Sequence, residues 1–192
     1  MRLLIAACLL LIALPAAAET FVFKERGLKI TMPDGWVIVS AQDMAQLVED
    51  SDFGPELKAQ AQSNDPNLLV AVAEEWPAIG VAPGIQLKQY PGSVVDVDAG
   101  LNNVLSALKA NARNFEVLAG PTADPLGDFA AAFVRYRYDV AVGGVNLTVE
   151  EKFWLIPNGQ TYLVISSGYA PDATAQIRAT VDAAAASLSR LH

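Results

Sequence analysis

Histidine and cysteine are almost absent from this chain of 192 residues. The one cysteine is Cys8, and the one histidine is the last residue, His192. A cysteine nucleophile, a Ser-His-Asp triad and a zinc site built on His or Cys therefore lack their essential groups in the body of the chain. No Gly-x-Gly-x-x-Gly segment or Gly-Lys-Ser phosphate loop occurs either. These absences favour a protein that has no catalytic activity and carries no metal or other cofactor.

A long hydrophobic run is also missing, but a short one stands at the start. Arg2 precedes 12 apolar residues (3–14), and a proline and three alanines follow. A membrane-spanning helix needs about 20 such residues, whereas a positive start, a short apolar run and a small-residue end are typical of a secretory signal peptide. We expect cleavage near Ala18 and Glu19, which leaves residues 19–192 as one globular domain in the periplasm or outside the cell.

An alternative use of this segment involves Cys8. The tetrapeptide Ile5-Ala6-Ala7-Cys8 resembles the box that precedes a lipid-modified cysteine in bacterial lipoproteins. Cutting before Cys8 would leave almost no apolar segment for the export machinery and would place the apolar residues 9–14 at the new N-terminus. We therefore expect Cys8 to be removed with the signal peptide, so that the mature chain has no stable membrane span.

Positive charge is scarce in what remains. Arg2 is the one charged residue among residues 1–18, so its removal changes the formal net charge from −8 to −9. An excess of acidic side chains disfavours nucleic acid and anionic membrane surfaces as partners.

Apolar periodicity predicts an α+β protein. Alternating and short apolar runs predict strands, and one-sided stripes with three- and four-residue spacing predict helices. The predicted strands are 21–23, 28–32, 37–39, 68–75, 85–89, 115–118, 129–142, 145–156 and 161–168. The predicted helices are 43–49, 55–62, 98–113 and a last one that opens at Pro171 and carries its apolar stripe to Leu191; irregular chain is expected over most of 76–100 and 120–127.

Two turns set a register for the last three strands. Gly143-Gly144 is typical of a two-residue hairpin loop, which places Tyr136 opposite Glu151. If Asn158-Gly159 is the next loop, Ser166 continues that row. Both faces of these strands are apolar at one end, so cover is needed on both sides. We therefore predict an antiparallel β-sheet sandwiched between helices.

The polar end of this sheet supplies the candidate site residues. Tyr136, Glu151 and Ser166 form a polar row on one face, and Arg135, Arg137 and Lys152 form a basic patch on the other. A positive patch on an acidic protein is typical of an anion site or a docking surface for an acidic partner. The alternative is ordinary solvated strand residues, with Arg137 and Glu150 as a cross-strand pair.

Two acidic segments are weaker candidates for calcium ligands. They are residues 49–52 and residues 96–98, and neither matches a known calcium loop. Asp98 also suits the N-cap of the helix that follows it. We therefore predict no metal site.

Three segments resemble the superfamily that includes the photosystem accessory protein PsbP, the Ran-binding protein Mog and the bacterial envelope protein DcrB. They are Leu28 to Trp36 (an apolar strand, then Pro, Asp, Gly and Trp), Thr161 to Tyr169, and the helix that ends in Ala185-Ala186-Ser187-Leu188. The resemblance implies the fold of these proteins over most of the mature chain. It also implies an accessory or binding role, and it offers no shared catalytic residue.

Three functions follow from these observations. The favoured one is an exported envelope accessory protein that acts by contact with another envelope protein through the basic patch. The second is a periplasmic binding protein or sensor for a small ligand, which predicts a pocket near Tyr136, Glu151 and Ser166. The third is a hydrolase that uses paired carboxylates, which requires two acids close together in a cleft.

Overall fold

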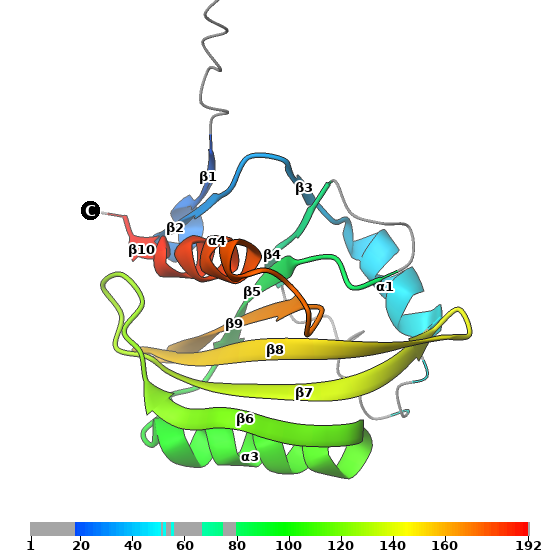
Figure 1. The fold of residues 1–192 in the computed structure, drawn as a ribbon. Coiled ribbons are helices and arrows are strands. Elements are labelled where there is room, and N and C mark those ends of the chain that lie inside the picture. The colour runs from blue at the N-terminus through cyan, green and yellow to red at the C-terminus, as the bar shows by residue number, and fades with distance from the viewer. Residues whose placement is uncertain (1–17, 51, 53–54, 56–66, 75–79, 192) are drawn as a thin grey trace, which may run out of the picture.

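Seven strands form the main sheet of the computed structural model, which describes residues 18–50, 52, 55, 67–74 and 80–191. The strands follow the order β3-β4-β5-β9-β8-β7-β6, and each pair of neighbours is antiparallel. Figure 1 shows β6, β7 and β8 running side by side along the length of the molecule. Their bounds are Trp36–Ile38 (β3), Asn67–Ala73 (β4), Gly84–Pro91 (β5), Arg113–Ala123 (β6), Ala132–Val142 (β7), Val145–Asn158 (β8) and Thr161–Tyr169 (β9).

A second, three-stranded sheet has the order β1-β2-β10, with β1 at Glu19–Phe23, β2 at Leu28–Met32 and β10 at Ser189–Arg190. The predicted N-terminal hairpin is confirmed, because Phe21 pairs with Ile30 across a short 3-10 turn at Lys24–Arg26. Residues 1–17, which hold the predicted signal peptide, and nearly all of the predicted helix 55–62 lie outside the described residues.

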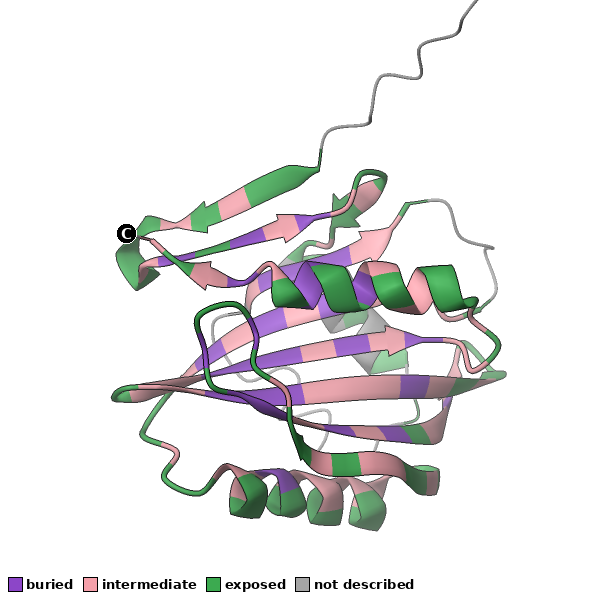
Figure 2. Cartoon of the chain, turned by 60° about the vertical axis from the view of Figure 1, so that its left-hand side comes forward, coloured by how far each residue is buried: buried purple, intermediate pink, exposed green. Residues whose placement is uncertain are grey.

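Two hydrophobic cores lie on opposite faces of the main sheet. Helix α3 (Val97–Asn111) packs on one face, where Leu101 contacts a cluster that includes Val134 and Leu155. Helix α4 (Ala175–Ala186) and β2 cover the other face, where their side chains join Trp154 and Leu163. Figure 2 shows buried residues along the central strands and exposed residues on the outer side of α3. The predicted antiparallel sheet and the α+β class are confirmed. The predicted sandwich between helices is not, because α4 shares its cover layer with the small sheet.

The first predicted hairpin has the expected register. Gly143 and Gly144 form the two-residue loop, with φ of 56° and 81°, and Val142 pairs with Val145. Both loop positions of such a turn require positive φ, which glycine adopts without strain. Tyr136 consequently lies opposite Glu151, as predicted.

The register of the second hairpin differs from the prediction by two residues. Its loop is Gly159-Gln160, because β8 continues through Pro157 and Asn158 pairs with Thr161. Ser166 therefore lies opposite Phe153, and Gly168 lies opposite Glu151. A slip of two residues keeps each side chain on its predicted face of the sheet, whereas a slip of one would have reversed it.

The last helix starts later and ends earlier than predicted. Thr174, not Pro171, is its N-cap, and the Thr174 hydroxyl accepts a hydrogen bond from the Ile177 amide at 3.2 Å. The helix ends at Ala186, and the chain then extends so that Ser189 and Arg190 pair with β2. The helical part of the predicted stripe therefore stops at Ala184, and both Leu188 and Leu191 lie outside the helix.

Three further boundaries needed correction. Helix α3 is capped by Asp96 rather than Asp98, because the Asp96 carboxylate accepts from the Ala99 amide at 2.9 Å. Strand β6 extends into the stretch predicted as a loop after residue 120, and β5 spans eight residues of the stretch predicted as largely irregular. The first helix is confirmed as α1 (Ala41–Asp50), with Ser40 capping it through the Asp43 amide at 3.1 Å.

Among the described residues, no helix has both the length and the apolar character that a membrane crossing requires.

We expect Ser187→Ala to lower the free energy of unfolding by about 1 kcal/mol. The Ser187 hydroxyl accepts from the Thr31 amide at 2.8 Å and donates to the Ala184 carbonyl at 2.6 Å, so it joins the end of α4 to β2. The alanine variant leaves the Thr31 amide without this partner. Urea denaturation measures the loss, and Ser189→Ala, two residues away in β10, is the matched control. Equal stabilities of the two variants would contradict this prediction.

Candidate functional site

The three predicted basic residues lie on the face of the sheet that α4 covers, and each is paired with an acid. Arg135 Nε lies 3.7 Å from Glu150, and Lys152 Nζ lies 3.1 Å from Asp124. Arg137 donates from Nε to Glu116 at 2.8 Å. The patch is therefore a set of charge pairs rather than an excess of positive charge.

Lys152 is the most enclosed of these cations. Its ammonium group lies 4.4 Å from the ring centroids of both Phe133 and Trp154, and a second acid, Asp182 of α4, lies 3.5 Å away. Only 15% of the Lys152 side chain is exposed. An acidic partner would have to displace these contacts before it could bind the ammonium group.

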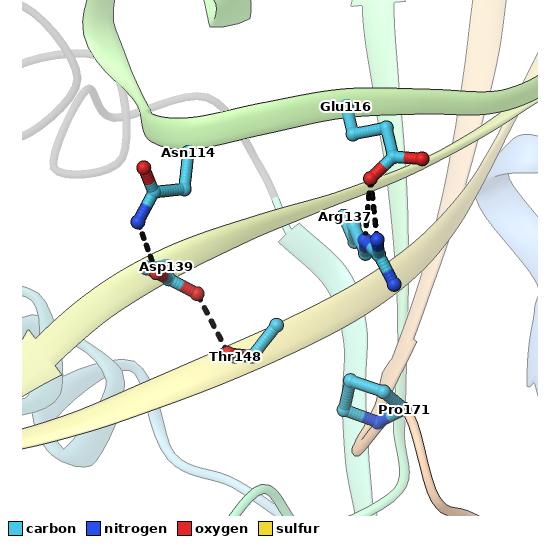
Figure 3. A pocket seen from close by; sticks show the side chains of 6 residues that line it. All are labelled: Asn114, Glu116, Arg137, Asp139, Thr148 and Pro171. Atoms are coloured by element: carbon cyan, nitrogen blue, oxygen red, sulfur yellow. Dashed lines mark hydrogen bonds and ion pairs between the residues drawn. The ribbon is translucent and has the colours of Figure 1, made fainter.

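A polar hollow of about 450 Å³ lies beyond the N-terminal end of α4, lined in part by Pro171. Figure 3 shows that each charged side chain in it already has a partner within the hollow. Asp139 accepts hydrogen bonds from Asn114 and Thr148, both at 2.6 Å, and Arg137 binds Glu116. The hydrogen bonds from Asn114 and Thr148 hold the pKa of Asp139 below its usual value. The hollow therefore offers a ligand few polar groups that are not already engaged.

The opposite face carries a second pocket, of about 460 Å³, beside α3. Strands β5, β7, β8 and β9 supply its floor, and α3 supplies one wall. Three of the predicted site residues, Tyr136, Glu151 and Ser166, line it together. The other residues of its lining are Gln86, Lys88, Tyr90, Asn103, Val104, Ala107, Leu108, Ala112, Tyr138, Phe153, Tyr162 and Val164. We refer to this cavity as the Glu151 pocket.

Hydroxyl groups surround the carboxyl group of Glu151. Tyr138 donates to Glu151 Oε2 at 3.3 Å, and Tyr136 and Ser166 also hydrogen-bond to the carboxyl group. Burial raises the pKa of Glu151 to about 7, because the loss of water outweighs these hydrogen bonds and the positive charge of Lys88, which favour the ionised form. The acid therefore changes its charge near neutral pH.

Two glycines continue the cross-strand row that contains Glu151. Gly168 pairs with Glu151, and Gly84 of β5 pairs with Gly168 in turn. A Cβ on Gly168 would meet its nearest neighbour, Val149, at an ordinary 3.6 Å. Two positions of the cross-strand row that contains Glu151 therefore carry no side chain.

Aromatic side chains give the pocket firm walls. Tyr90 and Tyr162 stack with ring centroids 5.1 Å apart, and Tyr136 packs against Phe115 at 5.6 Å and Tyr138 at 6.1 Å. Burial raises the pKa values of Tyr136 and Tyr138 well above the usual value, so both keep their protons. The walls thus offer aromatic rings to a bound molecule.

Among the described residues that line this pocket, Glu151 is the one acid. The paired-carboxylate hypothesis requires a second acid close to Glu151, and the described residues that line the pocket do not include one. Nor do three or more His, Cys, Asp or Glu side chains cluster as a metal site anywhere in the described part of the chain. The predicted calcium segments are used structurally instead: Asp96 caps α3, and Asp52 accepts from the Ala141 amide at 2.6 Å.

Sequence reasoning missed the contribution of β5 and α3 to the pocket. Gln86, Lys88 and Tyr90 alternate with the buried Ile85, Leu87 and Gln89, which is the signal of a strand with one face toward a cavity. The strand itself is predicted at residues 85–89, but nothing in the sequence places it next to β9. The α3 residues that face the pocket follow from the placement of the helix, which sequence alone does not give.

No family model matches the chain, and no curated protein is significantly similar to it. Several solved structures share its fold. LpqN of Mycobacterium tuberculosis, described as involved in cell envelope biogenesis, is 19% identical over 90% of both chains, with a TM-score of 0.54. The cyanobacterial PsbP protein of Synechocystis is 13% identical over 91% of this chain and 93% of its own, with a TM-score of 0.57. The Ran-binding protein Mog1p of Saccharomyces cerevisiae is 11% identical over 92% and 96%, with a TM-score of 0.53. The chain therefore has the fold of the PsbP and Mog proteins, as the sequence resemblance implied.

Proposed function

We propose that this chain is a binding protein of the bacterial cell envelope that holds a small ligand in the Glu151 pocket and catalyses no reaction. The observation that carries the proposal is a half-buried carboxyl group inside a cavity of about 460 Å³, surrounded by hydroxyl donors and aromatic rings. An apolar pocket with a few convergent polar groups and a perturbed pKa is the usual form of a small-molecule site.

The envelope location rests on two further observations. The first 18 residues have the pattern of a signal peptide, and the N-terminal strand begins at Glu19, directly after the expected cleavage position. LpqN, which has the same fold, is described as a protein of cell envelope biogenesis. Both support a periplasmic or secreted binding role.

Action by protein contact has weaker support. Mog1p binds Ran, so the fold is compatible with a protein partner. The surface expected to bind one here, however, consists of Arg135, Arg137 and Lys152, and acids of this chain already pair with all three. We therefore propose the pocket, and not the basic residues, as the main binding site.

We expect Ala107→Trp to abolish ligand retention in the Glu151 pocket. Ala107 lies on α3 and lines the pocket, yet its side chain is exposed, so an indole ring there fills the cavity without disturbing the core. The full chain would be expressed in its native envelope, purified and examined by native mass spectrometry for a bound small molecule. The wild-type chain should carry a mass that the variant lacks.

Ala110→Trp is the matched control, because Ala110 is also an exposed position of α3 but does not line the pocket. It should retain the ligand. If the wild-type chain carries no ligand, even after incubation with the small-molecule fraction of the envelope, or if both tryptophan variants retain it, the pocket is not the binding site.

A further inference from the structure

Two adjacent acids of β8 have opposite surroundings. Glu150 faces α4, is 5% exposed, and lies 2.9 Å from Arg178 and 3.7 Å from Arg135. Glu151 faces α3, and none of the ion pairs between described residues includes it. Its partners are the hydroxyl groups of Tyr136, Tyr138 and Ser166. Glu150 therefore lies between two guanidinium groups, whereas Lys88 is the one cation among the described residues that line the Glu151 pocket, and its charge does not offset the effect of burial on the pKa of Glu151.

Hydroxyl donors orient a carboxylate but carry no positive charge. Holding an ionised carboxyl group away from water is unfavourable unless an opposite charge lies close to it. A cation placed in the pocket, within contact of Glu151, would add its positive charge to that of Lys88 and gain a charge-assisted hydrogen bond with the carboxylate. The fixed tyrosines mean that the carboxyl group is already held in position before the cation arrives.

The rest of the lining suits an organic cation better than a metal ion. Phe153, Val164 and Leu108 line the same cavity as Glu151, together with four tyrosines. Apolar side chains favour the hydrocarbon part of a ligand, and tyrosine and phenylalanine rings attract ammonium groups through their π-electrons. A divalent metal ion would require several oxygen ligands with charge, and Glu151 is the one acid among the described residues of the lining.

We infer that the ligand of the Glu151 pocket is a small organic cation, an ammonium group on an apolar body, whose charge lies against the Glu151 carboxylate. This inference rests on the proposed binding function and adds the chemical class of the ligand. The ammonium group then lies at Glu151, and the apolar body lies against lining side chains such as Phe153.

Binding of such a ligand depends on the ionisation of Glu151. The titratable groups that face it are Tyr136 and Tyr138 of β7, Tyr162 of β9, and Tyr90 and Lys88 of β5; α3 contributes amide and apolar side chains. Because the pKa of Glu151 is raised to about 7, the carboxyl group is neutral at pH 5.5 and negative at pH 8.5. An ammonium group therefore binds more tightly at the higher pH.

The test compares three probes with the same apolar body and different charge: phenethylamine, phenethyl alcohol and 3-phenylpropionate. The dissociation constant of each for the purified chain would be measured by NMR titration at pH 5.5 and 8.5. At pH 8.5 we expect phenethylamine to bind about tenfold more tightly than the alcohol, and about tenfold more tightly than it does itself at pH 5.5. The propionate should bind most weakly.

Three variants assign the effect to individual charges. Glu151→Gln should remove both the preference for the amine and its pH dependence, whereas Glu25→Gln, which removes an exposed acid of the N-terminal turn, should change neither. Lys88→Gln removes the positive charge that acts on Glu151 and should strengthen binding of the amine several-fold at pH 8.5. A ligand that bound through Lys88 as an anion would show the reverse.

The inference is overturned if phenethylamine binds no better than phenethyl alcohol, which includes the case that no probe binds, or if the propionate binds best. It is also overturned if the mass retained from the envelope belongs to a neutral or acidic molecule. Neither result contradicts the proposed function, provided that the Ala107→Trp variant lacks the retained molecule and the Ala110→Trp variant keeps it.

Discussion

Gly127→Ala is expected to lower the free energy of unfolding by about 3 kcal/mol. Gly127 has φ of 52°, and a Cβ at this position would collide with the carbonyl oxygen of Leu188. Leu188 is fully buried and lies between the end of α4 and β10, so its backbone has little freedom to move. Equilibrium denaturation in urea measures the loss, provided that the transition remains two-state.

The loop around Gly127 explains why this contact matters. Leu126 and Phe129 form an isolated antiparallel bridge, and both are buried in the core that α4 covers. The loop therefore closes over the end of α4, and its close approach to Leu188 requires a residue without a side chain.

Gly143→Ala separates the two causes of the expected loss. Gly143 has a similar φ of 56°, but a Cβ there would meet nothing within 4 Å. This variant should lose only the conformational term, about 1 kcal/mol. Equal losses in the two variants would mean that the chain near Leu188 relaxes and that the close contact has no energetic weight.

Glycines in tight turns also explain which parts of the fold the sequence predicts. Gly143-Gly144 permits one common type of tight loop, and this loop fixes the pairing of β7 with β8 from Val142 to Ala132. The pairing of Tyr136 with Glu151 followed directly from it. Turn chemistry thus located two of the three residues of the polar row before any tertiary contact was known.

The second hairpin shows where such signals end. Asn158-Gly159 is a common turn sequence, so the strand before it is predicted to end at residue 156. In the structure β8 also includes Pro157 and Asn158. The predicted and observed registers place the same side chains on the same faces, so the apolar pattern fits both equally well. In the folded chain β9 lies between β8 and β5, a tertiary arrangement that the apolar pattern does not encode.

Charge balance was the least predictable property of the candidate site. The basic patch was inferred from Arg135, Arg137 and Lys152, and its partners Glu116, Asp124 and Asp182 come from distant parts of the chain. Glu151 likewise lies opposite Gly168 and under the influence of Lys88, and the predicted registers place neither residue near it. Strand pattern places a charge on a face, but tertiary packing decides whether that charge is neutralised.

Glu151→Gln is expected to stabilise the protein by about 2 kcal/mol at pH 8 and to have almost no effect at pH 4. The pKa of Glu151 is raised by burial to about 7, above the ordinary value of 4.5. Between pH 4.5 and pH 7 the folded state binds more protons than the unfolded state does. The free energy of unfolding of the wild-type chain therefore falls as the pH rises through this range. Glutamine is neutral at every pH and avoids this loss, while it retains groups that hydrogen-bond with Tyr138 and Ser166.

Urea denaturation of both chains at pH 4, 6 and 8 tests this expectation, with Glu25→Gln as a control for the general effect of removing one negative charge. The free energy of unfolding of Glu151→Gln should exceed that of the wild-type chain by an amount that grows with pH, whereas that of Glu25→Gln should not. A destabilising effect at pH 8 would mean that the ionised carboxylate is held favourably by Lys88 and the hydroxyl groups, and that the pocket does not need an external cation. A stabilising effect, together with loss of amine binding, would show that the chain keeps at this position an acid that weakens the fold and serves the ligand.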